Sequence, residues 1–154
     1  KPRTPAGLLT ATMEARLKET LERLFRLLGL RYPQRQIYAA YLAVRDGKRD
    51  DQAAALEFLD STLDRELKRI VVPILDDPGL VAQRGRDLFG IQVPDPETAI
   101  RQLLETGDEW LVSCAIATAG QLKLRGLVAE IDAVGSRAEG DVPHVARAAM
   151  AMLT

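Results

Sequence analysis

The sequence predicts an all-α protein whose helical hairpins stack as a short right-handed solenoid behind a long N-terminal helix. Hydrophobic residues make up 47% of the 154 residues but aromatic residues only 5%, which favours packed Leu- and Ala-rich helices over sheets. Apolar residues recur at spacings of three and four over most of the chain, as on the buried face of a helix. Turns containing glycine or proline separate these stretches.

The N-terminal region predicts a linker followed by a long amphipathic helix. We expect residues 1–10, with two prolines, to be the linker and the domain to cover residues 11–154. Because the chain begins with Lys1, we also expect it to be a piece of a longer protein. The helix over residues 11–32 ends before Pro33, since proline disfavours the α conformation in the preceding residue. Its apolar face comprises Met13, Leu17, Leu21, Leu24, Phe25, Leu27 and Leu28.

Three further helices are expected before residue 77. The second covers residues 34–45. Asp50 or Asp51 is expected to cap the third helix and Asp64 the fourth, because a carboxylate accepts hydrogen bonds from the free N–H groups of a first turn. Pro73 lies within the fourth helix and predicts a kink or an early stop there.

The C-terminal half of the chain predicts the most regular hairpins. Asp77 and Pro78 are expected to begin a helix that Gly90 closes, in the preferred order of cap, proline and terminal glycine. Glycine-containing turns then separate four helices, which are predicted over residues 96–105, 109–122, 125–134 and 142–153.

A repeated pattern links two of these helices. Leu111 and Val145 are 34 residues apart, as are Ala115 and Ala149, a period typical of helical hairpin repeats. The small alanine side chains are expected to let one helix approach its neighbour closely.

An aspartate, then aliphatic residues, then small residues recur in residues 106–120, 77–81 and 141–149. This pattern resembles HEAT repeats over residues 34–153, and the resemblance implies a curved solenoid. Residues 84–86 depart from it, because Arg-Gly-Arg replaces small apolar residues, and residues 135–140 lengthen the last turn.

A narrower resemblance lies in ERLFRLLGLRY (residues 22–32), AAALEFLD (53–60) and LKRIVVPILDD (67–77). These stretches look like the soluble HEAT segment of bacterial ATP/ADP carrier-like nucleotide transporter proteins. The resemblance implies a neighbouring membrane domain of the same chain and a place at the cytoplasmic face of a membrane. It assigns no transport residue to this sequence.

Charge and composition limit the partners. A net charge of −1 gives no overall field that would attract nucleic acid or anionic lipid. The chain has no run of about 18 apolar residues, so no membrane insertion is expected. A single cysteine, Cys114, favours a reducing compartment, and we predict a cytoplasmic location.

The sequence predicts no catalytic residue, cofactor or metal. Cys114 and the single histidine, His144, fall in different predicted repeats, and alanines flank the cysteine, so we expect it in the core. No second histidine stands at metal-binding spacing. Residues 85–90 lack the glycine spacing of a phosphate-binding loop. The Asp50-Asp51 pair is expected to act in helix capping.

Several surface positions are candidate partner contacts. Trp110 is expected to pack over the adjacent hairpin, with a role as partner anchor as the alternative. Basic residues at Arg45, Lys48 and Arg49 lie among aspartates, so we expect local ion pairs there. The polar residues that we expect on a partner-binding face are Gln52, Glu57, Gln83, Arg84, Asp87, Ser113 and Gln121.

We therefore predict a non-catalytic protein-binding or scaffolding module, whose second helices line a concave surface for a protein partner. One alternative is a cytoplasmic regulatory segment of a transporter-like membrane protein. Another is an enzyme that resembles helical-repeat DNA-base glycosylases. That enzyme would need a catalytic aspartate and a basic concave face, and the near-neutral charge argues against it.

Overall fold

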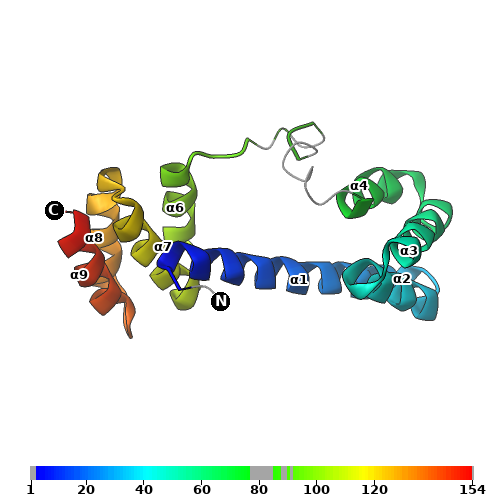
Figure 1. The fold of residues 1–154 in the computed structure, drawn as a ribbon, viewed down its shortest axis with the longest axis horizontal. Helices are drawn as coiled ribbons and strands as arrows, with labels where there is room; N and C mark the ends of the chain where they lie inside the picture. The colour runs from blue at the N-terminus through cyan, green and yellow to red at the C-terminus, as the bar shows by residue number, and fades with distance from the viewer. Residues whose placement is uncertain (1–2, 77–84, 88–89, 91, 154) are drawn as a thin grey trace. The chain divides into compact units, whose positions relative to one another are not determined.

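The computed structural model describes residues 3–76, 85–87, 90 and 92–153 (Figure 1), and every regular element in these residues is helical. The predicted all-α class and the long N-terminal helix are therefore confirmed. The helices are α1 (Pro5–Arg31), α2 (Gln34–Asp46), α3 (Arg49–Thr62), α4 (Arg65–Asp76), α6 (Pro96–Leu104), α7 (Glu109–Leu122), the 3₁₀ helix η2 (Arg125–Leu127), α8 (Val128–Arg137) and α9 (Val142–Leu153).

Contacts divide the chain into two compact units. Unit 1 comprises Lys1–Arg16 and Pro94–Thr154, and unit 2 comprises Leu17–Val93. Helix α1 supplies residues to both units, with the division after Arg16.

Helix α1 begins before the predicted position, so residues 5–10 are helical and not a linker. Thr4 caps it: its hydroxyl oxygen accepts a hydrogen bond from the Gly7 N–H at 3.1 Å, and its carbonyl oxygen accepts one from the Leu8 N–H at 2.9 Å. Pro5 follows at the first helical position, where a missing N–H costs nothing. Leu9 packs against the unit 1 core, which holds this first part of α1 in place.

In unit 2, the end of α1 packs with α2, α3 and α4 around a core that includes Phe25, Ile37 and Leu59. The expected early stop at Pro73 is wrong, because α4 continues to Asp76. Val71 and Leu75, on either side of the proline, are both buried. Their burial offsets the backbone hydrogen bond that proline removes.

Aspartates at the starts of α3 and α4 behave differently. Lys48 occupies the cap position of α3, and the Asp51 carboxylate accepts a hydrogen bond from the Lys48 N–H at 3.2 Å. Asp51, in the first turn, therefore binds back to the cap residue. The cap position itself belongs to Lys48, so the prediction that Asp50 or Asp51 is the cap residue is wrong. Asp64 caps α4 as predicted, since its Oδ1 accepts hydrogen bonds from the N–H groups of Glu66 and Leu67.

The Asp64 carboxylate also ties α4 to the end of α1. Its Oδ2 accepts a hydrogen bond from the Tyr32 hydroxyl at 3.0 Å and lies 3.1 Å from the Arg31 guanidinium. The N–H of Leu67, followed by the Tyr32 hydroxyl, holds the pKa of Asp64 below its ordinary value of 3.8. The ionised carboxylate therefore stabilises this corner of unit 2.

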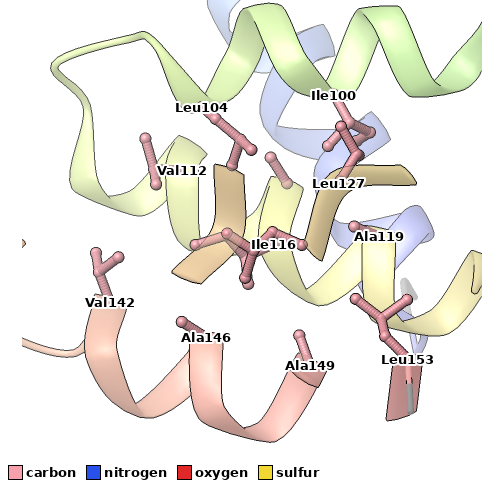
Figure 2. Packing of buried hydrophobic residues seen from close by; sticks show 12 residues of the cluster. Ile100, Leu104, Val112, Ile116, Ala119, Leu127, Val142, Ala146, Ala149 and Leu153 are labelled. Carbon is pink, nitrogen blue, oxygen red and sulfur yellow. The ribbon is translucent and has the colours of Figure 1, made fainter. Parts of the chain in front are cut away.

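Unit 1 is built around α7. Eight of its 14 residues are buried, so this helix contacts neighbours on most of its circumference. Figure 2 shows Ile116 of α7 at the centre of the core, with Val142 and Ala146 of α9 on one side and Leu104 of α6 on the other. The four helices predicted over residues 96–153 are confirmed, except that η2 forms the first turn of the third and α8 extends to Arg137.

Helix α9 approaches both α7 and α8 at glycines. A Cβ atom added to Gly120 of α7 would lie 3.0 Å from Ala149 Cα, and one added to Gly135 of α8 would lie 2.7 Å from Ala146 Cβ. Ala115 and Ala149, predicted to permit close approach, are both fully buried. Small residues on both sides of each contact therefore set the helix spacing.

Replacing Gly135 by alanine should destabilise unit 1 by about 1–2 kcal/mol, because the clash with Ala146 outweighs the gain in helix propensity. Chemical denaturation followed by the fluorescence of Trp110, the one tryptophan, measures the effect. Gly107→Ala is the control, since a Cβ there meets nothing within 4 Å. Adding Ala146→Gly should recover part of the loss, and no recovery would contradict the packing argument.

Asp64→Asn should reduce the acid sensitivity of unit 2. A lowered folded-state pKa adds stability that is complete well above 3.8 and is lost as pH falls through the folded pKa. Asparagine still caps a helix, so the variant removes mainly the charge. Helical circular dichroism in denaturant between about pH 6 and pH 2.5 should therefore show a shallower loss of stability. Asp60→Asn removes an exposed partner of Lys68 as the control, and an identical slope in all three proteins would refute the assignment.

Candidate binding groove on unit 1

The first turns of α1 lie antiparallel to α7 through side-chain contacts. The Ala6 N–H donates a hydrogen bond to Gln121 Oε1 at 2.9 Å, near the end of α7. Trp110 Nε1 donates to Thr12 Oγ1 at 3.2 Å, near its start. Increasing numbers on α1 thus meet decreasing numbers on α7.

Asp108 completes this contact at the start of α7. Its Oδ1 caps the helix by accepting a hydrogen bond from the Leu111 N–H at 3.0 Å. Its Oδ2 forms an ion pair with the Arg16 guanidinium of α1. One carboxylate therefore both begins α7 and fixes the direction of α1 beside it.

An open apolar groove lies between these first turns of α1, α7 and α9. Its volume is about 370 Å³, within the range of pockets that receive small ligands or single side chains. Its lining is mostly apolar and comprises Arg3, Thr4, Pro5, Leu8, Trp110, Ser113, Cys114, Ala117 and Val145.

Trp110 stands at this groove with 56% of its surface exposed. Its indole N–H is satisfied by Thr12, so the ring is fixed in place while much of its surface stays available. The side chain of Trp110, expected to pack over the adjacent hairpin, is therefore only partly covered by its neighbours. Fixed, half-exposed tryptophans are favourable anchors for a partner.

Cys114 is buried beside the groove, as predicted for a core residue. Burial raises the pKa of its thiol, and a hydrogen bond with Thr12 opposes part of that rise. The thiol therefore stays protonated at neutral pH, which makes it a poor nucleophile. Within the described part of the chain, no three His, Cys, Asp or Glu side chains gather in a way that could hold a metal ion.

The other sequence-predicted contact residues are dispersed. Gln121 is exposed but holds the Ala6 N–H, and Ser113 lines the groove. Gln52 and Glu57 are exposed on α3 in unit 2. Asp87 is exposed, and Gln83 and Arg84 lie outside the described residues.

Sequence reasoning missed the contribution of α1 to the groove, which comes from Pro5, Leu8 and Thr12 among others. The two prolines in residues 1–10 favour a linker there. The Thr4-Pro5 pair was the available signal, because a threonine followed by proline is typical of a helix start.

The predicted basic surface at Arg45 is locally neutralised. The Arg45 guanidinium donates a hydrogen bond to Asp46 Oδ2 at 2.6 Å and lies over the Tyr41 ring. The hydrogen bond that Arg45 donates to the Asp46 carboxylate is the main cause of the raised pKa of Arg45. This confirms the local ion pair expected there. His144 is exposed, and its Nδ1 lies 2.7 Å from an Arg147 nitrogen.

A second cavity of about 370 Å³ lies between α6 and α8. Arg101 Nε donates a hydrogen bond to Glu130 Oε1 at 2.9 Å, and its NH2 group donates to Glu97 Oε1 at 3.2 Å. Glu130 is the main cause of the raised pKa of Arg101, and Arg101 lowers the pKa of Glu130 in return. The paired charges at this second cavity connect α6 to α8 and leave little unmet binding capacity. The groove at Trp110 is mostly apolar and open, which makes it the stronger candidate site.

No protein-family model matches the chain, and no curated protein or solved structure matches it significantly. Among the described residues, no helix is both long and apolar enough to cross a bilayer.

Thr12→Val should loosen the first turns of α1, because it removes the acceptor of the Trp110 indole. The Thr12 hydroxyl also donates to the Leu8 carbonyl of its own helix, so the loss is measured relative to a variant that removes a similar bond. The additional loss in the stability of unit 1 should be about 0.5–1.5 kcal/mol, the net value of one hydrogen bond. The single indole N–H resonance in a ¹⁵N-correlated NMR spectrum should shift as well. Thr10→Val is the matched control, since Thr10 donates to the Ala6 carbonyl of its own helix. Equal effects of the two variants would contradict the assigned contact.

Proposed function

We propose that the chain is a non-catalytic protein-binding module that uses the groove at Trp110 to receive a partner. The observation that carries this proposal is the open groove of about 370 Å³, lined mainly by apolar side chains, beside a half-exposed tryptophan. A partner that covers this groove would remove apolar surface from water, which is the main favourable term in association.

The geometry of the groove favours one inserted side chain. Leu8 and Trp110 have 36% and 56% of their surfaces exposed, and Ala117 and Val145 are partly buried. A large apolar residue of a partner would fill the space between them, while surrounding contacts exclude water. The fixed indole orientation reduces the entropy lost on binding.

The proposal includes a HEAT-like, right-handed arrangement of hairpins. Two features support it. The first helices of successive hairpins, α6 and α8, pack together, as do the second helices, α7 and α9. The 34-residue spacing between Leu111 and Val145, and between Ala115 and Ala149, relates α7 to α9. Repeats of this kind stack neighbour on neighbour and present one face to partners.

Selection from a random peptide library displayed on phage tests the proposal without a known partner. Peptides with an apolar anchor should be enriched on the parent protein. Their affinity should fall about tenfold or more in Trp110→Ala, because truncating a central anchor commonly costs about 2 kcal/mol. Ala117→Met, which fills the groove and leaves the Trp110–Thr12 contact unchanged, should also weaken binding.

Leu122→Ala is the matched control, because Leu122 is 48% exposed on the same helix and does not line the groove. It should bind the selected peptides as the parent does. Failure to enrich any peptide, or equal binding to the parent and both groove variants, would refute the proposed function.

A further inference from the structure

Among the described residues, the groove has one positively charged side chain and no carboxylate that pairs with it. Of its nine lining residues, all in the described part of the chain, Arg3 is the only charged one. No described carboxylate forms an ion pair with Arg3, whereas Arg16, farther along α1, pairs with Asp108. The groove thus combines an apolar surface with one exposed cation.

This combination selects for a particular ligand chemistry. An apolar group gains by leaving water, and a carboxylate beside it gains by meeting Arg3 in a charge-assisted hydrogen bond. A cationic group at the same place would be repelled. Charge complementarity of this kind contributes more to partner choice than to total affinity.

We propose that the groove recognises an acidic peptide segment, in which one apolar side chain enters beside Trp110 and a neighbouring carboxylate contacts Arg3. This inference rests on the proposed function. A peptide is the occupant because the groove is open: a small acid of similar size would remain largely in water, whereas a peptide also covers the rim around Leu8 and Trp110.

Charge reversal tests the role of Arg3 with peptides taken from the phage selection. Peptides enriched on the parent should carry Asp or Glu close to the apolar anchor. Arg3→Glu should weaken the binding of such a peptide about fivefold, as expected for a solvent-exposed ion pair. The same peptide with its acid replaced by lysine should prefer Arg3→Glu over the parent. Fluorescence or indole N–H shifts of Trp110 confirm that each peptide occupies the groove.

Arg125→Gln is the matched control, because Arg125 is an exposed arginine of unit 1 that does not line the groove. It should leave every affinity unchanged. The affinity of the parent for the acidic peptide should also fall with added salt more steeply than that of Arg3→Gln.

The outcomes separate this inference from the proposed function. Peptides that need Trp110 but ignore the charge at position 3 would overturn the acidic preference and leave the binding module intact. Absence of any groove-dependent peptide would overturn both. A concentration-dependent dimer that Trp110→Ala abolishes would identify a second copy of the chain as the occupant and would also overturn the inference.

Discussion

The close approach of α9 to two neighbouring helices is the constraint on which unit 1 depends. Gly120 and Gly135 leave no room for a side chain where Ala149 and Ala146 meet them. Because α9 lies this near, Ile116 and its neighbours form one continuous core (Figure 2). Packed cores transmit small changes in spacing, so these contacts constrain how α7, α8 and α9 pack together.

The groove is a consequence of that packing and of the way α1 is attached. Ala6 and Thr12 bind α7 mainly through polar contacts with Gln121 and Trp110. Leu9 is the α1 residue that packs against the core. Polar contacts hold the helix without filling the space behind it, and an apolar cavity remains between α1, α7 and α9. The site is thus the part of the interface that α1 leaves unfilled.

Most of the fold, but little of the site, could be predicted from the sequence. Apolar spacing located the helices after residue 95 to within three residues, because their apolar stripes and glycine turns agree. The early stop expected at Pro73 does not occur, because burial of Val71 and Leu75 offsets the local cost of the proline. The contribution of α1 to the site was missed, because apolar periodicity within a helix does not show which distant segment packs beside it.

Unit 1 is discontinuous, and this affects how the protein is made. Thr12 and Trp110 are separated by 98 positions in the chain, so the ribosome releases the first turns of α1 long before their binding surface exists. Contacts between such distant positions form late, since the intervening loop entropy opposes them. Unit 2 can collapse during synthesis. Leu8 and Leu9, by contrast, stay without their native neighbours until α7 and α9 have emerged. During that period their apolar side chains are exposed surface of the kind that chaperones bind.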